Sequence, residues 1–464
     1  MCDQSSLHGQ PEGESLTERL VSLCHRRIAP ADRACAARLL LDWAGVAMAG
    51  AMTRQGAAMR GMGRGRGGCT VLAGGTADAE GAAFVNGSYG TLLEMDDLHR
   101  ASILHAGDVV IPAALAAAQE AGGDGAGMLD AIVAGYEVAL RIGLAASEGG
   151  YSAWYNSGTC GVFGAAMAAA RAKGLSDEQT CDALGQAGMQ ASGLWQCRLE
   201  PTDSKCLATA HAARAGVSAA RCAAAGLRGA RHILEGELGF FATLYPNVEP
   251  GGICADRSGW MIQEVSLKPW PACRHVHPAI GAALHMRPGV DVSVIERVTI
   301  GTYAAGIAFC DQPHPATPHE ARFSFQHIVA IALLRGAPGL ADCTTEAIAD
   351  SQVAALRARI AVSEDPALTA AFPARMGATV GIVRADGTSL SRTAEHAPGD
   401  PEMPMPEDAV RDKFHANLDA AGIGRDAAKG LVRSIAALHD APSLADLTCS
   451  LDALIPRNPE EFIP

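Results

Sequence analysis

The sequence has few charged and few aromatic side chains, and its charge is unevenly balanced. Charged residues make up 19% of the 464 positions and aromatic residues 5%, while 48% are hydrophobic, a composition that excludes an intrinsically disordered chain. Lysines and arginines number 37 against 50 acidic residues, a net charge of −13. We therefore expect neither nucleic acid nor an anionic membrane as a partner, because the surface as a whole repels polyanions.

Long apolar runs are absent as well. No stretch of about 18 uncharged apolar residues occurs, so no membrane span is expected. Residues 1–15 are polar and contain no apolar core of a signal peptide. We predict a cytoplasmic globular protein with two or three domains on length alone.

Motifs for disulfides, metals and nucleotide cofactors are also missing. The 14 cysteines contain no C-x-x-C pair, which disfavours a disulfide scaffold and structural zinc, so reduced and mostly buried thiols are expected. No G-x-S-x-G elbow, Walker loop or H-E-x-x-H occurs. A G-x-G-x-x-G at Gly63, Gly65 and Gly68 follows a helical pattern instead of a strand, so it is no dinucleotide fingerprint. We expect no metal and no cofactor.

What is present predicts a mostly α-helical protein with a smaller α+β domain. Alanine- and leucine-rich helical periodicity runs to about residue 264, with a clear amphipathic helix over residues 128–146. A second helix is predicted to start at Pro112 and to stop at Gly122. The abundant alanine indicates close helix packing.

The pattern changes near residue 265. Residues 292–303, 358–365 and 378–395 alternate apolar and polar side chains, which is typical of a strand meander. Helical periodicity resumes over residues 409–438 and 444–454. We predict a helical domain over 1–266, an α+β lid domain over 267–400, and a segment over 401–464 that returns to the helical domain.

Four segments are rich in polar side chains. The densest runs from residue 94 to 112, ahead of a helix N-terminus, and is either a metal or acid/base cluster or a solvated acidic turn. Polar residues that start at Tyr155 are a ligand loop or an ordinary helix cap. Lys205 is functional or simply salt-bridged, and the segment from Lys268 to His277 favours acid/base work or packing over zinc. The first segment contains Glu94, Asp96, Asp97, His99 and His105, and the last contains Lys268, Arg274, His275 and His277.

These segments resemble the MmgE/PrpD family. The similar stretches cover residues 70–97, 104–120, 158–175, 268–280, 320–336 and 399–405. The resemblance implies a large helical domain built from both chain ends, an inserted α+β lid, a homodimer, and a site in the cleft between the domains. It also implies chemistry that needs no cofactor.

The resemblance also implies which residues carry the reaction. Asp97, His105, Lys205 and His277 stand at positions of the family's functional aspartate, histidines and lysine. Tyr155 stands where dehydratases and decarboxylases of the family carry a histidine, and we assign it to the catalytic set as well. Glu94 and Arg274 complete the expected site as substrate-binding residues.

We expect a lyase that dehydrates a small polycarboxylate or related acid by removing a proton next to a carboxylate. Histidine suits the base because its ordinary pKa is about 6.5, whereas tyrosine, at about 10, suits a general acid unless a neighbour such as Lys205 lowers its pKa. Alternatives are an epimerase of an iminodisuccinate-like acid with a Tyr/His or Tyr/Lys pair, and a non-catalytic family member that only binds a ligand.

Overall fold

A computed structural model describes residues 13–63, 66–200, 202–456 and 463 of the chain. Residues 1–12 of the polar N-terminal segment and Gly65 of the glycine motif lie outside the described residues. The remainder of that motif lies between a helix, α3, and a strand, β1. This is the reverse of the strand, glycine loop and helix order of a dinucleotide site.

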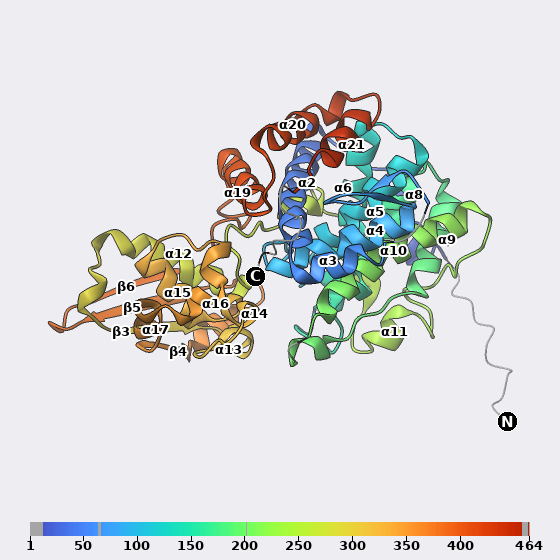
Figure 1. The fold of residues 1–464 in the computed structure, drawn as a ribbon. Helices are drawn as coiled ribbons and strands as arrows, with labels where there is room; N and C mark the ends of the chain where they lie inside the picture. The colour runs from blue at the N-terminus through green and yellow to red at the C-terminus, as the bar shows by residue number, and fades with distance from the viewer. Residues whose placement is uncertain (1–12, 64–65, 201, 457–462, 464) are drawn as a thin grey trace.

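The larger part of the molecule is helical (Figure 1). Its main helices from the N-terminal half are α1 (Leu16–Leu23), α2 (Pro30–Ala51), α3 (Arg54–Arg60), α4 (Ala79–Tyr89), α5 (Gly107–Ala121), α6 (Gly125–Ala146), α7 (Asn156–Thr159), α8 (Gly161–Ala172), α9 (Asp177–Gly188), α10 (Ser204–Ala224) and α11 (Phe240–Leu244). Strands β1 (Cys69–Thr70) and β2 (Thr76–Ala77) form a small antiparallel pair.

Small residues let these helices approach closely, as the alanine content predicts. α8 packs against α5, α6 and α10. A Cβ atom on Gly135 of α6 would lie 2.8 Å from the Gly164 carbonyl oxygen of α8, so neither glycine position admits a side chain without movement of the backbones. The predicted helix over residues 128–146 is confirmed as α6.

α5 corrects the predicted helix start. The helix begins at Gly107, and Pro112 lies inside it. Proline has no N–H to give to the Asp108 carbonyl, so the helix tolerates it only by leaving that carbonyl without its i+4 donor. The expectation of Pro112 as a first-turn residue was wrong because proline marks a helix start only statistically.

The C-terminal segment packs onto the helical part. It forms α19 (Glu407–Ala420), α20 (Arg425–Ala436) and α21 (Ala445–Asp452). The single helix predicted over residues 409–438 is two helices, since Gly422 between them adopts a φ of 70°. Lys413 of α19 donates to Asp42 of α2 (2.7 Å) and to the Met95 carbonyl (2.9 Å).

α2 is the one helix of the described residues with the length and apolar composition to cross a membrane, and 83% of the relevant window is buried inside the protein. Its partners include α4, α6 and α19. α2 is thus a central core helix of the helical part.

The smaller α+β part is built on a four-stranded sheet. The strands are β3 (Ile295–Thr302), β4 (Ile360–Glu364), β5 (Ala378–Arg384) and β6 (Ser389–Ala394), in the order β4-β3-β5-β6. Its helices are α12 (His277–Met286), α13 (Ala304–Cys310), α14 (Pro318–Arg322), α15 (Phe325–Leu334), α16 (Thr345–Ala349), α17 (Ser351–Arg357) and α18 (Pro366–Ala371).

The sheet corrects the predicted meander. β5 and β6 form the expected hairpin, but β4 pairs with β3 in parallel. A parallel neighbour requires a crossover, which α13 to α17 supply between the two strands. α12 and α15 cover the face that carries Val298, Val380 and Ile382.

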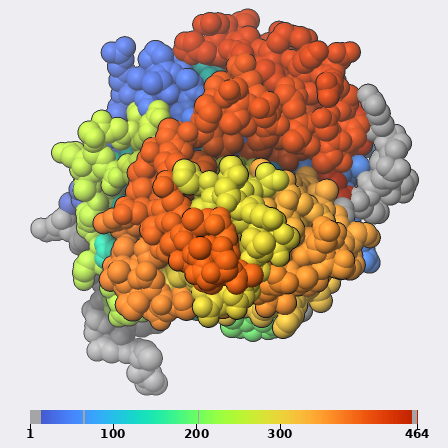
Figure 2. Space-filling model, turned by 90° about the vertical axis from the view of Figure 1, so that its left-hand side faces the viewer, coloured from blue at the N-terminus to red at the C-terminus, as the bar shows by residue number. Residues whose placement is uncertain are grey.

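The molecule has two hydrophobic cores, and the chain passes from one core to the other at the segments that connect the two parts. Leu267 and Met405 belong to the core of the helical part, whereas Trp270 and Ile382 belong to that of the α+β part. In Figure 2 the α+β part lies in front, with the C-terminal segment directly above it. The predicted boundaries near residues 266 and 400 stay predictions.

Candidate active site

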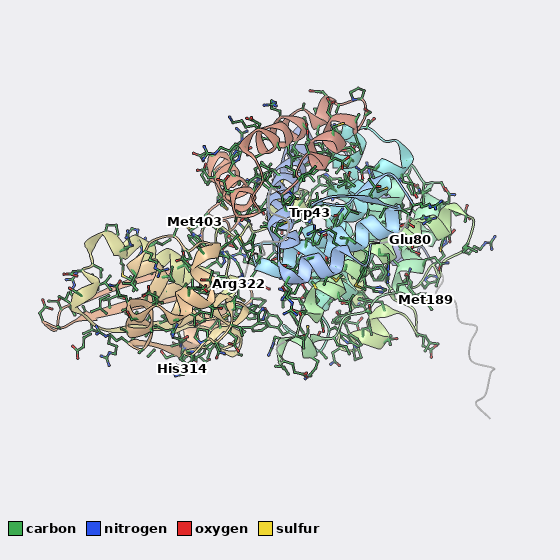
Figure 3. The ribbon with its side chains drawn as sticks, viewed as in Figure 1. Trp43, Glu80, Met189, His314, Arg322 and Met403 are labelled. Atoms are coloured by element: carbon green, nitrogen blue, oxygen red, sulfur yellow. The ribbon has the colours of Figure 1, made fainter. Side chains whose placement is uncertain are left out.

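A cavity of about 390 Å³ lies where the helical part faces the α+β part. The helical part contributes residues near positions 94–105, 151–155 and 195–205, and the α+β part contributes residues near positions 268–275, 307–323 and 376. In Figure 3, Arg322, next to the lining residue Phe323, lies at this boundary, whereas His314 lies at the outer edge of the α+β part. The size is within the range of about 300–1000 Å³ that is usual for small-molecule sites.

A loop between η2 (Gly90–Leu93) and α5 supplies the floor of this cavity. Glu94 begins the loop with a φ of 53°, a left-handed conformation that is rare for a residue with a side chain and that clusters at functional sites. The loop is held from outside, because Leu98 exchanges two backbone hydrogen bonds with Ser266 (2.8 and 2.9 Å). The segment that joins the two parts therefore also fixes the floor.

Two lysines and two carboxylates form a buried ion-pair chain on this floor. Lys205 pairs with Glu94, and Lys268 lies 3.4 Å from Glu94 Oε2 and 2.8 Å from Asp96 Oδ1. Although burial raises the pKa of Glu94, the two lysines hold it down at about 2. Burial lowers the pKa of each lysine, but attraction to the carboxylates has the larger effect. The pKa of both lysines is therefore raised above its ordinary value. All four groups are thus charged at neutral pH and neutralise one another.

His105 stands at the end of this chain with one ring nitrogen free. Its Nδ1 lies 2.9 Å from the Asp97 carbonyl oxygen and 2.7 Å from Asp96 Oδ2. Both neighbours are acceptors, so the ring proton belongs on Nδ1 and the lone pair on Nε2. Nε2 has no hydrogen-bond partner among the described residues, and His105 lines the cavity. Burial lowers the pKa of His105 despite Asp96, which keeps the ring neutral and able to accept a proton.

Asp97 takes a different place from the one predicted. Its Oδ2 accepts from the Tyr136 hydroxyl (2.6 Å) and its Oδ1 from the Gly107 amide (2.9 Å), and it does not line the cavity. Burial raises its pKa to about 7. The carboxylate beside His105 is Asp96, whose Oδ2 lies 2.7 Å from Nδ1. Asp97 therefore supports the loop and the start of α5.

The expected anion-binding helix N-termini are already occupied. The Gly107 amide of α5 donates to Asp97, and the Gly158 amide of α7 donates to the Tyr155 carbonyl (2.9 Å). These two amides are therefore not available to a substrate, because a helix N-terminus attracts the protein's own oxygens as well as a ligand's.

Tyr155 and Arg274 line the cavity with buried polar atoms that lack partners. Ser157, the polar side chain beside the Tyr155 hydroxyl, does not reach hydrogen-bond geometry with it, and burial raises the pKa of Tyr155. Arg274 is tied to Asp400 through Nη2, while its Nε and Nη1 have no partner among the described residues. Buried donors without partners are costly, so both groups are suited to a ligand.

His277 lies outside the cavity. It is fully buried against Trp270, its Nε2 donates to the Ala272 carbonyl (3.0 Å), and burial holds its pKa well below the usual value. In its place His275 lines the cavity, between the hydroxyls of Tyr151 (3.0 Å) and Tyr303 (2.5 Å). A neutral imidazole can accept only one proton, so one of the two tyrosines donates to it.

Asp96, Lys268 and His275 were named in the candidate polar segments but not among the expected site residues, and Tyr151 was not named. Lys268 carried a usable signal, since it is one of only five lysines in the chain and such a residue is buried only when it is paired. Tyr151 follows two glycines and carried none.

A group with metal-ligand spacing in the described part of the chain consists of His396, Asp400 and Glu402. The Arg100 guanidinium already lies against it, 2.7 Å from Glu402 and 3.4 Å from Asp400. A cation therefore occupies the centre of this group, which joins the connecting segment to the cavity floor.

Comparison with known proteins identifies a family whose two domain models cover most of the chain. Residues 14–251 match the model of the MmgE/PrpD N-terminal domain, and residues 270–434 that of the MmgE/PrpD C-terminal domain. Cis-aconitate decarboxylase of Homo sapiens is 27% identical over 82% of this chain and 80% of that protein. Cis-aconitate decarboxylase of Aspergillus terreus is 24% identical over 82% and 79%. 2-Methylcitrate dehydratase of Cupriavidus necator is 28% identical over 48% and 49%.

Proposed function

The chain belongs to the MmgE/PrpD family and has a lyase or dehydratase type of role, and from this premise we propose that it removes a proton next to a carboxylate and then expels a β-hydroxyl group. The observation that carries the proposal is the orientation of His105. Its Nδ1 is held by two acceptors, while Nε2 has no partner, and His105 lines the same cavity as Arg274 and Tyr155, two residues with buried donors that lack partners among the described residues.

The steps follow from these contacts. Arg274 binds one oxygen of the substrate carboxylate through Nη1, which Asp400 leaves without a partner. His105 Nε2 takes the α-proton, and Asp96 stabilises the resulting imidazolium at Nδ1. The negative charge that develops on the substrate carboxylate is met by the guanidinium.

Tyr155 completes the elimination as the general acid. Its raised pKa means that the phenol carries a proton to give to the leaving hydroxide, which departs as water. The proton on His105 then returns to the phenolate, so the enzyme ends as it began. The unsaturated acid is the second product.

Lys205 and Glu94 have a positioning role in this scheme. The sequence places Lys205 in the expected catalytic set and Glu94 among the expected substrate-binding residues, and in the structure the two side chains are paired with each other. Together with Lys268 they fix Asp96 against His105.

Epimerisation would need a second base opposite His105. Tyr155 does not fit that task, because burial raises its pKa and Lys205 does not offset the rise. A role in ligand binding alone would not require the neutral ring of His105 to keep an unpartnered Nε2 that can accept a proton. We also propose the homodimer that the family resemblance implies, which light scattering of the purified protein tests.

Hydrogen exchange tests the proposal. The enzyme is incubated in deuterated buffer with a panel of β-hydroxy acids, and deuterium at the α-carbon and the appearance of an alkene are followed by NMR. We expect both with the native enzyme and neither with His105→Gln. His285→Gln is the matched control, since His285 is exposed and does not line the cavity. Inverted configuration without an alkene would instead establish an epimerase.

A further inference from the structure

We propose that the substrate carries a single carboxylate in the buried part of the site and a bulky apolar substituent, preferably an aromatic ring, on the β-carbon. This inference rests on the proposed function and narrows it. It departs from the polycarboxylate expected from the sequence, and from the tricarboxylates after which the relatives are named. The charge balance of the cavity and its aromatic wall point to it independently.

The lining of the cavity has no excess of positive charge. Among the described residues it contains four cations and four carboxylates, and burial lowers the pKa values of its three histidines, which are thereby neutral. The cations are Arg198, Lys205, Lys268 and Arg274, and the carboxylates are Glu94, Glu200, Asp311 and Glu320. Two further carboxylates, Asp96 and Asp400, lie directly behind Lys268 and Arg274.

The two lysines of the cavity floor are already paired with carboxylates of the protein. Both lysines are bound by Glu94, and Lys268 also by Asp96. Among the buried cations of the lining, only Arg274 has donors without a partner in the described part of the chain, and one such guanidinium matches one carboxylate. Arg198 is exposed and lies over the Phe309 ring at 4.1 Å, so it belongs to the rim.

A buried tricarboxylate would place two more negative charges beside Glu94 without matching cations. Charges taken out of water need such partners, because their hydration is lost on binding. The floor of this cavity therefore disfavours a tricarboxylate and accepts a monocarboxylate.

The opposite wall is aromatic. Five aromatic side chains line the cavity, although such residues make up only 5% of the sequence. Trp195 lies 4.5 Å from Tyr155 and 6.3 Å from Phe309, and Tyr151 lies 4.7 Å from Phe309, all measured between ring centroids. The rings come from both parts of the molecule. Because neighbouring rings lie this close together, they form one continuous surface. Rings in such arrangements bind a further ring edge to face or offset.

The test compares two β-hydroxy acids that differ only in the β-substituent, 3-hydroxybutanoate and 3-hydroxy-3-phenylpropanoate, with two tricarboxylates, citrate and cis-aconitate. Affinity is measured by calorimetry, and α-proton exchange is followed for the two β-hydroxy monocarboxylates. We expect the phenyl acid to bind at least tenfold more tightly than 3-hydroxybutanoate and than either tricarboxylate. Equal or tighter binding of a tricarboxylate overturns the inference, as does equal binding of the phenyl and methyl acids.

A variant pair localises the effect. Trp195→Ala is expected to weaken the phenyl acid at least tenfold and 3-hydroxybutanoate less than twofold. Leu238→Ala, at a residue that is 82% exposed and does not line the cavity, should change neither. An equal loss for both acids in Trp195→Ala refutes the aromatic wall as the specificity surface. If no acid exchanges its α-proton, the proposed function fails, while the binding order still decides the substrate class.

Discussion

Replacing Asp96 by asparagine separates the role of this carboxylate from that of its neighbour Asp97. Asp96 Oδ2 lies 2.7 Å from His105 Nδ1, a distance at which an effective dielectric constant of about 20 gives an attraction of about 6 kcal/mol toward the imidazolium. An asparagine amide removes this attraction and can donate to Nδ1, which would place the ring proton on Nε2 and abolish the base.

We expect Asp96→Asn to slow α-proton exchange by about 100- to 10,000-fold, the range for loss of a general base. Asp97→Asn is the comparison, since burial raises the pKa of Asp97 to about 7 and its side chain contacts Tyr136 and Gly107 instead of the ring. Its exchange rate should fall less than tenfold. Circular dichroism melting verifies that both variants are folded. A loss in Asp97→Asn equal to that in Asp96→Asn would refute the assignment.

Three further predictions follow from the same geometry. Arg274→Lys removes the unpartnered guanidinium donors and should raise KM more than tenfold with a smaller effect on kcat, which steady-state kinetics on the preferred acid will show; an unchanged KM would contradict carboxylate binding there. Tyr155→Phe should reduce alkene formation by about 100-fold while α-proton exchange persists, and parallel loss of both would remove Tyr155 from the acid role. Folded Asp97 keeps its proton to about pH 7, whereas the unfolded residue loses it near pH 4. Folded protein therefore binds more protons between these values, and the free energy of unfolding should fall by up to about 4 kcal/mol as pH rises from about 4 to about 7. Urea titrations of the native protein and of Asp97→Asn measure this slope, which the variant should lack; equal slopes would refute the raised pKa.

The periodicity of side chains along the sequence predicted the fold class. The strand pairing could not be predicted in the same way, because it depends on segments that are far apart in the sequence. Apolar and polar side chains alternate along β3, β5 and β6 in the sequence. This alternation arises because one face of the sheet is covered by helices such as α12. The parallel register of β4 with β3 depends on how α13 to α17 fold between them. No pattern within β4 itself encodes that choice.

The site was predictable to within a residue or two, but not further. The segment around residues 94–105 was recognised by its density of carboxylates and histidines, yet only the backbone decides that Asp96 faces His105. The same holds for His275 and His277. They lie on η6 (Arg274–Val276) and at the start of α12, where a separation of two residues turns side chains to different sides. One reaches the cavity and the other the core.

The return of the C-terminal segment to the helical part has a consequence for synthesis on the ribosome. α2 emerges early but stays without α19, its later partner, until the whole α+β part has been translated. During that interval an apolar helix lacks part of its cover, the kind of nascent-chain surface that chaperones hold. Lys413, which donates a hydrogen bond to the carbonyl of Met95 next to Asp96, is translated late. Chemistry in this enzyme thus begins only after translation has passed α19.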